Sequence, residues 1–458
     1  MSVIRKLWQW VFIVLLIILM CSVYAVRTIK QGAEAYIFGY PLVLMELTRQ
    51  AMEADATKGA NHLYHLRSFP DHTFRNVVRP NNDTVYSVNW FDLKKEPMII
   101  SVPDSDRYYV LPFMDAWTNV FSSIGSRTTG NKAGHYALAG PDWRGKLPKD
   151  VNLIESPTNM VWMVGRIRAN SQADMVKVAH MQDHMAITPL SQWAIGQPLP
   201  AKVVDGSSKG SDKRHPKALI DGLSAAEFFN LLSELMATQP AAKSDADALH
   251  NLSQLGVVPG KSFNLASRGF IDRWLIKKSV SIANAKLHEA TDNQSTSPME
   301  NGWVIWRGII GEYGTNYQVR AGVAMRALAA LAPKEAAYPS ASVDVNGEVL
   351  TGQNQYKIQF KKGQTPPAHA FWSITMYNSE GFLIDNPIKR YVIGDRNELA
   401  FNHDGSLDIY IQHTPPPSGE SNWLPSPNGQ FSILMRIYNT KQSFLDGSWQ
   451  VPAIERIN

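Results

Sequence analysis

The sequence has 458 residues, of which 44% are hydrophobic and 19% charged, and 45 basic against 40 acidic residues give a formal net charge of +5. Its 30 Gly and 27 Pro are an ordinary share, which excludes a collagen-like or low-complexity chain. No run of five like charges occurs, so the sequence shows no nucleic-acid footprint. The one cysteine, Cys21, excludes an internal disulfide framework and a cysteine-rich zinc site. A chain of this length is expected to form two or three domains.

The first predicted element is an apolar segment close to the N-terminus. Arg5 and Lys6 precede residues 7–26, which carry no charge. At about 1.5 Å per residue, a helix over this run spans roughly the 30 Å hydrocarbon layer of a membrane. The run predicts a signal anchor, or transmembrane helix, within residues 1–28. A cleaved signal peptide is the alternative, since residues 23–25 place small side chains where a signal peptidase reads.

The charges around this segment bear on its orientation. Arg5 and Lys6 lie before the uncharged run, and Arg27 and Lys30 lie after it, so the positive-inside rule discriminates weakly. The free N-terminal amine favours a cytoplasmic N-terminus. We therefore expect a protein of the bacterial cell envelope, anchored in the inner membrane with its globular part in the periplasm. Cleavage would instead give a secreted or soluble periplasmic form.

Residues 29–170 are predicted to form a helix followed by a β-rich domain. Residues 29–56 are apolar on one face, which predicts a helix with a kink at Pro41. Strand-forming runs then occur between turn formers, at 84–92, 98–102, 108–113 and 160–166. Short strands at regular spacing favour a sandwich-like sheet.

A mainly helical connecting segment is expected at 171–339. The apolar periodicity predicts helices at about 172–186, 224–237, 268–291 and 317–332. Two pairs, Ser171 with Asp174 and Ser224 with Glu227, have the spacing of a capping box at a helix start.

Strand patterns return in the C-terminal domain, residues 340–458. The Asn346-Gly347 pair predicts a hairpin turn. Strand-forming runs follow at 356–360, 370–377, 407–412 and 431–438. The predicted fold class is therefore α+β. Two β-rich lobes, about 73–170 and 340–452, are joined by a mainly helical segment and preceded by the N-terminal helix.

Standard catalytic motifs are weak or absent. Residues 206–210 match the G-x-S-x-G pattern, but the strand and helix that a nucleophile elbow requires do not flank them. His180 and His184 have the spacing of metal ligands on a helix, yet the Glu of an H-E-x-x-H motif is missing, and a polar helix face explains them. No motif assigns a metal, a cofactor or an oligomeric state.

The first of two candidate clusters lies at strand ends. It joins residues 79–86, whose Pro and Asn-Asn-Asp run is typical of a turn, to residues 115–119 at the end of another predicted strand. Polar groups beside Trp and Tyr are the usual material of a binding pocket. The candidates are Asn81, Asn82, Asp83, Tyr86, Asp115, Trp117 and Asn119. A set of Asx-turns that closes a sandwich is the structural alternative.

The second cluster lies in the C-terminal strands. Trp372 and Met376 can share one strand face, and Arg390 and Arg436 can stack on aromatic rings. Trp372 and Arg390 are the ligand-binding candidates here. The alternative is an aromatic core whose polar tips are hydrogen-bonded within the protein.

The same clusters carry a family resemblance. The motifs at 79–92, 108–119 and 127–130 resemble the bacterial family called domain of unknown function 1254. The motifs at 370–381, 386–391, 404–406, 422–425 and 436–438 resemble its usual partner, domain of unknown function 1214. The resemblance covers most of residues 34–452 in the family's order. It implies two β-rich lobes joined by helices and frequent export, and it implies no agreed reaction and no catalytic set.

Three functions are compatible with these patterns. The first is a hydrolase-like envelope enzyme for a small polar or glycan-like substrate. In that enzyme Asp83 and Asp115 are the catalytic pair, one acting as general base and the other orienting it or holding a cation. The second is a protein that binds such a ligand without chemistry, and the third is a structural envelope protein. The expected partners are the membrane, through the N-terminal segment, and a small-molecule ligand.

Overall fold

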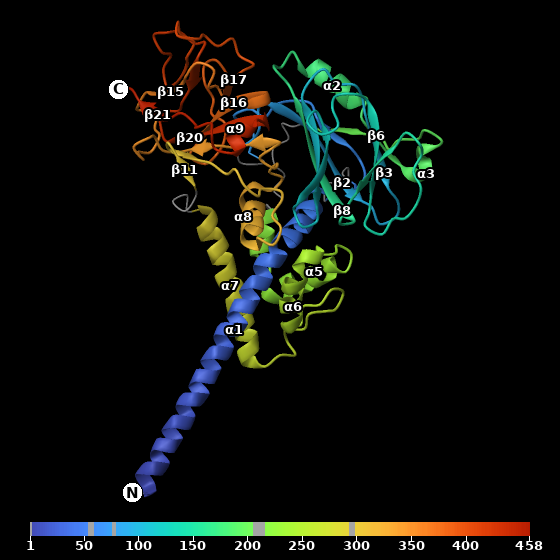
Figure 1. Cartoon of the computed structure of the whole chain (residues 1–458), viewed down its shortest axis with the longest axis vertical. Helices are drawn as coiled ribbons and strands as arrows, with labels where there is room; N and C mark the ends of the chain where they lie inside the picture. Colours follow the sequence, from blue (N-terminus) through green and yellow to red (C-terminus); the bar gives the residue numbers. More distant parts are fainter. Residues whose placement is uncertain (1, 54–58, 76–78, 205–215, 293–297) are drawn as a thin grey trace. The chain divides into compact units, whose positions relative to one another are not determined.

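The chain divides into two compact units, one helical and one β-rich (Figure 1). The computed structural model describes residues 2–53, 59–75, 79–204, 216–292 and 298–458. The helical unit comprises Met1–Ala51, Arg214–Asp292 and Gly314–Leu328. The β-rich unit comprises Met52–Lys213, Asn293–Tyr313 and Ala329–Asn458. The α+β class is confirmed, with β-rich lobes, helices between them in the chain, and an N-terminal apolar helix.

The helical unit is built on one long helix, α1 (Ser2–Glu53) (Figure 1). Between Leu7 and Val26 its side chains are uncharged, mostly apolar and mostly exposed, whereas beyond Thr28 most of them are buried. Among the described residues, α1 is the one helix long and apolar enough to cross a membrane. The predicted boundary at residue 28 therefore falls inside a continuous helix. Pro41 also lies within it.

Shorter helices pack around the second half of α1. Those described are α4 (Pro216–Asp221), α5 (Ala225–Met236), the 3₁₀ turn η1 (Lys243–Asp245), α6 (Ala246–Gln254), α7 (Phe270–Asp292) and α8 (Tyr317–Ala327). Tyr36 of α1 packs on Phe228 with ring centroids 4.4 Å apart. Close helix contact requires small residues, and a Cβ at Gly39 would overlap the Cδ2 atom of buried Leu232.

The first lobe of the β-rich unit, residues 59–204, contains two sheets around one core. One sheet has the order β10 (Lys202–Val204), β1 (Tyr64–Leu66), β2 (Thr84–Asp92), β8 (Met160–Arg168), β4 (Tyr109–Asp115) and β5 (Val120–Gly125). The other has the order β7 (Asn152–Glu155), β6 (Gly134–Ala139), β3 (Met98–Val102) and β9 (Ala186–Pro189). Apolar side chains from both sheets, among them Phe91, Ile100 and Leu111, form the core between them. The helices α2 (Met175–Asp183) and α3 (Leu190–Trp193) complete this lobe.

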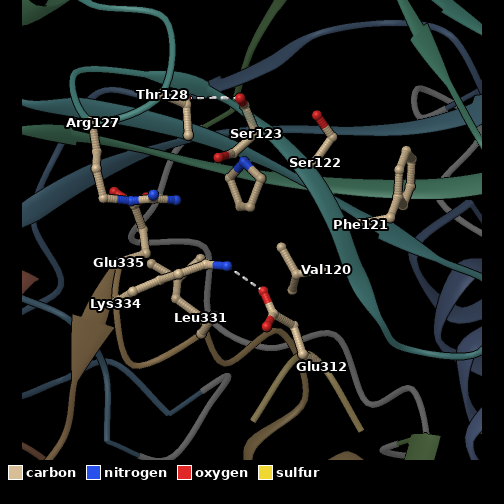
Figure 2. A pocket seen from close by; sticks show the side chains of 12 residues that line it. Val120, Phe121, Ser122, Ser123, Arg127, Thr128, Glu312, Leu331, Lys334 and Glu335 are labelled. Carbon is tan, nitrogen blue, oxygen red and sulfur yellow. Dashed lines mark hydrogen bonds and ion pairs between the residues drawn. The ribbon is translucent and has the colours of Figure 1, made fainter. Parts of the chain in front are cut away.

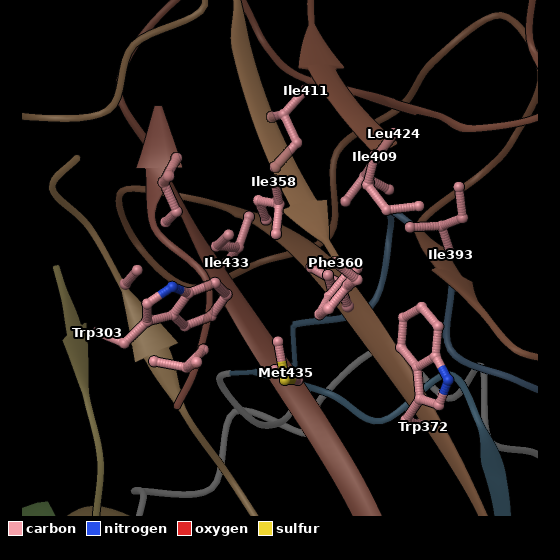
Figure 3. Close-up of a cluster of buried hydrophobic side chains, with 14 of the residues drawn as sticks. Trp303, Ile358, Phe360, Trp372, Ile393, Ile409, Ile411, Leu424, Ile433 and Met435 are labelled. Atoms are coloured by element: carbon pink, nitrogen blue, oxygen red, sulfur yellow. The ribbon is translucent and has the colours of Figure 1, made fainter. Parts of the chain in front are cut away.

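The second lobe, residues 298–313 and 329–458, also contains two sheets. The larger has the order β11 (Met299–Glu300), β12 (Trp303–Val304), β14 (Ser340–Ala341), β20 (Phe431–Thr440), β16 (Ala368–Asn378) and β17 (Val392–Gly394), and β13 (Ala336–Ala337) also pairs with β20. The smaller has the order β19 (Trp423–Pro425), β18 (Leu407–Gln412), β15 (Tyr356–Phe360) and β21 (Ile454–Arg456). The short helix α9 (Gln442–Leu445) follows β20. Figure 3 shows the core between the sheets, where Phe360 of β15 packs on Trp372 of β16.

Both faces of the central strand β16 are buried, and they differ in chemistry. Side chains alternate along a strand, so Trp372, Ile374 and Met376 point into the apolar core of the second lobe. This confirms that Trp372 and Met376 share a face. Ser373 and Thr375 lie on the opposite face and are equally buried. That face contacts the first lobe, where Ser373 meets Asp83, and polar residues of both lobes therefore lie there.

The middle of the chain differs from the prediction in two respects. The segment 171–339 is helical in large part, but β9 pairs with β3 of the first lobe and β13 pairs with β20 of the second. The capping box forms at Ser224 and Glu227, as predicted. At Ser171 only half of the pattern forms. The Asp174 amide donates to Ser171 Oγ at 3.3 Å, but the Asp174 carboxylate accepts from Arg107 at 2.7 Å, and α2 begins at Met175.

Candidate functional site

The first predicted cluster lies where the two lobes meet. Residues 79–83 precede β2. They contact polar side chains of β16 and β20, among them Ser373 and Arg436. Ser373 Oγ donates to Asp83 Oδ2 at 2.6 Å, and an Arg396 guanidinium nitrogen lies 3.4 Å from Asp83 Oδ1. Asp83 is 1% exposed. The carboxylate is therefore a buried link between the lobes.

Arg436 on β20 is the centre of this network. Its guanidinium donates to Thr375 Oγ1 at 2.6 Å, to Tyr377 Oη at 2.8 Å and to the Arg79 carbonyl at 3.2 Å. Burial alone lowers the pKa of Arg436, but Tyr377, Tyr438 and Asp83 together raise it above its ordinary value. The charged guanidinium thus donates to oxygens of both lobes, and these hydrogen bonds hold the lobes together.

The Asn residues of the first cluster are also bonded to protein groups. Asn81 Nδ2 donates to Tyr438 Oη at 2.9 Å, and its Oδ1 accepts from the amide of Asp83 at 2.7 Å. Asn82 Nδ2 donates to the Pro70 carbonyl at 2.7 Å. Tyr86 lies under the Arg166 guanidinium, 5.7 Å from its ring centroid. These contacts are those of the Asx-turn alternative.

Asp115 closes a turn at the end of β4. Its Oδ1 accepts from the amides of Trp117 at 2.9 Å and Asn119 at 2.8 Å, and its Oδ2 accepts from Asn119 Nδ2 at 3.0 Å. Thr118 between them has φ of 69°, a backbone conformation that such a turn stabilises. The carboxylate therefore caps local backbone amides.

The hypothesis that Asp83 and Asp115 face one cavity is wrong. Both β2 and β4 pair with β8, where Thr84 lies opposite Arg168 and Asp115 lies opposite Val161. Seven residues of strand separate these pairs, which is about 23 Å at about 3.3 Å per residue. The two carboxylates lie at opposite ends of the sheet.

Arg390 of the second cluster binds the backbone of a neighbouring loop. Its Nη1 donates to the carbonyls of Glu420 and of Trp423, the latter at 2.8 Å. Burial lowers the pKa of Arg390 from its ordinary value. The side chain thus positions the start of β19, whereas the other candidate of this cluster, Trp372, contributes to the wall of a cavity.

This cavity, named here the Trp372 cavity, has a volume of about 560 Å³ and lies on the second lobe. Its lining residues include Trp372 and Trp449, which are each 5% exposed, and Pro366 and Pro367. Among its lining residues, all in the described part of the chain, Asp395 and Lys441 are the charged ones. The exposed lining of this cavity is more polar than apolar. Its volume lies within the range of small-molecule sites, and the polar lining suits a polar ligand.

Asp395 is the titratable group of interest in the Trp372 cavity. It follows β17, and its amide donates to the Trp372 carbonyl at 3.3 Å. Burial raises the pKa of Asp395 to about 6, although Arg168, whose Nη2 lies 3.4 Å from its Oδ1, lowers it. The side chain is 33% exposed and faces the cavity space. It can therefore exchange a proton with, or hydrogen-bond to, a bound molecule near neutral pH.

A second cavity of about 300 Å³ is shown in Figure 2. Its charges are already paired, since Arg127 Nε lies 2.5 Å from Glu335 Oε2 and Lys334 binds Glu312. The remaining Glu335 oxygen accepts from Tyr108 Oη at 2.6 Å. These groups bind each other, so the Trp372 cavity is the better candidate site.

Metal-binding groups do not gather elsewhere. Within the described residues, no three His, Cys, Asp or Glu side chains are grouped so that they could hold a metal ion. The His184 ring nitrogen Nδ1 lies 2.8 Å from the His180 carbonyl, as on an ordinary polar helix face. The G-x-S-x-G match at 206–210 lies outside the described residues.

Sequence reasoning missed Asp395, Lys441 and Trp449. Asp395 directly follows β17, which ends at Gly394, and Lys441 directly follows β20. A charged residue after a strand is typical of a surface turn, so the local pattern did not single them out. These residues come together only through the tertiary structure, so no local sequence pattern could have identified them. The wall also takes residues 363–368 from the loop between β15 and β16.

Comparison with known proteins gives a family but no activity. Residues 60–189 match the family described as protein of unknown function DUF1254, and residues 335–442 match protein of unknown function DUF1214. No curated protein matches the chain.

Two solved structures cover nearly the whole chain. The VPA0106 protein from Vibrio parahaemolyticus is 23% identical over 94% of this chain and 100% of its own, with a TM-score of 0.71, and shares the fold. An uncharacterized protein from Burkholderia cenocepacia is 12% identical over 95% of this chain and 96% of its own, with a TM-score of 0.45. The order of the two matched segments is the one expected from the sequence motifs. The chain belongs to the proteins in which DUF1254 is followed by DUF1214.

Proposed function

We propose that this is a membrane-anchored protein of the bacterial envelope that binds a small polar, glycan-like ligand in the Trp372 cavity. Its globular part lies in the periplasm. The observation that carries the ligand proposal is the joint presence of Asp395 and Lys441 in a single cavity of about 560 Å³ whose lining residues also include Trp372 and Trp449. Carboxyl and ammonium groups recognise hydroxyl-rich ligands by hydrogen bonds, while Trp and Pro receive the apolar face of such a ligand.

The course of α1 supports an anchor over a cleaved signal peptide. Residues from Ile4 to Val26 expose their apolar side chains and continue without a break into the buried half of the helix. Tyr24 lies just before the predicted cleavage position, and its Oη donates to Asp272 Oδ1 at 2.5 Å. Cleavage at this position would remove a residue that takes part in the fold of the helical unit.

Binding without hydrolysis is the function that the cavity favours. Hydrolysis of a glycosidic bond ordinarily uses two carboxyl groups on either side of the bond. Asp395 is the carboxyl group among the lining residues, and Asp83 and Asp115 are both engaged elsewhere. The ionised Asp395 accepts hydrogen bonds from ligand hydroxyl groups, and Lys441 provides a charged donor.

Cell fractionation and a topology reporter test the anchor. We expect the protein to pellet with membranes, to resist high salt, and to keep its N-terminal residues. Alkaline phosphatase fused after Asn458 should be active, whereas a fluorescent protein that matures only in the cytoplasm should stay dark at the same position. A soluble form that begins at Val26 would exclude the anchor and leave the cleaved signal peptide.

Isothermal titration calorimetry with neutral sugars, amino sugars and short oligosaccharides tests the ligand. For the sugar that binds the detergent-solubilised full chain, Lys441→Ala and Asp395→Asn should each weaken binding about tenfold or more, since hydrogen bonds to charged groups contribute about 1.5–3 kcal/mol. Lys361→Ala and Glu398→Gln, which alter exposed residues outside the cavity wall, are the matched controls. Equal losses in controls and cavity variants would refute the site. Release of reducing ends by the wild type alone would instead support a hydrolase.

A further inference from the structure

The first turn of α7 exposes large apolar side chains. Phe270 is 75% exposed, Ile271 is 65% exposed and Trp274 is 56% exposed. They are not on the face by which α7 packs, since its buried residues include Leu275, Ile276 and Ser279. Clustered apolar side chains of this size on a helix surface mark a surface that another phase or molecule covers.

The position of this turn along α1 indicates what covers it. Tyr24, near the end of the uncharged run, donates its hydroxyl hydrogen to Asp272 in the first turn of α7. Further along, Gly32 lies so close to Ser279 that a Cβ there would overlap Oγ. The helix α7 therefore runs beside α1, with its first turn at the end of the exposed apolar stretch (Figure 1).

The charges continue this order away from the apolar stretch. Arg27 and Lys30 of α1 are exposed just beyond Tyr24, and Lys277 and Lys278 of α7 are exposed just beyond Trp274. The order along the helices is apolar, then aromatic, then basic. Membrane proteins place residues in this order from the hydrocarbon core through the interface to the lipid phosphates.

We propose that the first turn of α7 lies in the interfacial layer of the membrane that α1 crosses. Phe270, Ile271 and Trp274 enter the boundary between head groups and acyl chains, and Lys277 and Lys278 contact lipid phosphates. The surface is continuous with the exposed apolar side chains of α1, which is why the occupant is lipid and not a protein partner. The inference rests on the anchor in the proposed function.

Spin labels at single cysteines test the inference in the full chain. Cys21→Ser removes the one native thiol, and Val14→Cys, Ile271→Cys and Lys286→Cys then each carry a nitroxide. The protein is reconstituted in vesicles of equal parts phosphatidylcholine and phosphatidylglycerol. Collision with oxygen, which enters the hydrocarbon, is compared with collision with a water-soluble nickel chelate.

We expect three depths. The label at 14 reports hydrocarbon, and the label at 271 reports a depth of about 5–10 Å below the aqueous boundary. The label at 286, fifteen residues or about 22 Å further along α7, reports water. Phe270→Cys repeats the measurement one residue away, so that a local distortion at 271 does not decide the result.

Two results would overturn the inference alone, and a third would overturn the anchor on which it rests. A label at 271 as open to nickel as the label at 286, with 14 still in hydrocarbon, leaves the anchor intact and refutes the interfacial position. A label at 271 shielded from both reagents, with spin–spin broadening, assigns the surface to a second copy of the chain instead. A label at 14 in water would refute the anchor itself.

Discussion

Asp395→Asn is the substitution that tests the electrostatics of the Trp372 cavity most directly. Burial holds the pKa of this carboxyl near 6, above its ordinary value of 3.8. The folded protein therefore binds the proton more tightly than the unfolded chain does between pH 4 and pH 6. By linkage, this contribution to stability is complete below about pH 4 and is lost as the pH rises through 6. Asn stays neutral and removes this pH dependence.

The size of the effect follows from the shift and the exposure. A rise from 3.8 to about 6 is about two units, which corresponds to about 3 kcal/mol at about 1.36 kcal/mol per unit. The side chain is 33% exposed to the cavity, so solvent screening reduces the value to about 1 kcal/mol. We expect Asp395→Asn to match the wild type at pH 4 and to exceed it by about 1 kcal/mol, or roughly 2–4 °C in Tm, at pH 7.5.

Thermal unfolding of the detergent-solubilised full chain from pH 4 to pH 8 measures this difference. The variant Glu398→Gln, which neutralises an exposed carboxylate three residues away, is the control. Its difference in Tm from the wild type should not grow between pH 4 and pH 7.5. If Asp395→Asn runs parallel to the wild type at every pH, Asp395 has an ordinary pKa, and the cavity does not desolvate it.

Three further substitutions test the rest of the structure. Asp115→Ala should lower the free energy of unfolding by about 1–3 kcal/mol in urea titrations, because two turn amides lose their acceptor, and an unchanged midpoint would refute the cap. Ser373→Ala should cost about as much, since Asp83 loses its 2.6 Å donor, yet it should leave calorimetric ligand affinity unchanged; a loss of affinity alone would move the site to the lobe junction. Gly39→Ala should lower the helix melting temperature in circular dichroism, because overlap with Leu232 costs about 1–3 kcal/mol against a helix-propensity gain of about 1 kcal/mol; a rise would show that the helices separate easily.

Local pattern was sufficient for the strands that carry the fold. The runs at 84–92, 356–360 and 407–412 coincide with β2, β15 and β18. Each combines strand-forming residues with turn formers at both ends, and neither feature depends on distant parts of the chain. The helices at 224–237 and 268–291 were predictable in the same way, since periodicity and a capping box are local signals.

Sheet membership was not predictable from these signals. The strand β9 is four residues long, lies just after α2 and completes a sheet begun by β3, more than eighty residues earlier. Its edge position depends on long-range pairing, for which a single sequence holds no pattern. For a related reason, local signals do not mark where the exposed apolar part of α1 gives way to its buried part. Apolar residues in a membrane segment and in a core helix favour the same helical backbone, so nothing in residues 24–32 ends α1.

In the candidate site, too, local features were predictable and long-range contacts were not. Asn81, Asp83, Asp115 and Asn119 were singled out because polar residues cluster at strand ends, and the structure does hold them in ordered hydrogen-bond networks. Which networks join which strands is set by the register on β8, and that register separates Asp83 from Asp115. The sequence carries the turn chemistry, whereas distance across a sheet belongs to the tertiary structure.

Buried polar residues of a fold and those of a binding site have the same composition, so the number of protein partners must separate them. Arg436 donates to three oxygens within 3.2 Å and has no surface left for a ligand. Asp395 has Arg168 at 3.4 Å and a hydrogen bond with the Trp372 backbone, and a third of its side chain stays exposed at the cavity. A carboxyl desolvated by its surroundings but still partly exposed gains from a molecule that supplies hydrogen bonds. By this reasoning the polar face of β16 joins the lobes, and a ligand in the Trp372 cavity would lie on the opposite face of the same strand.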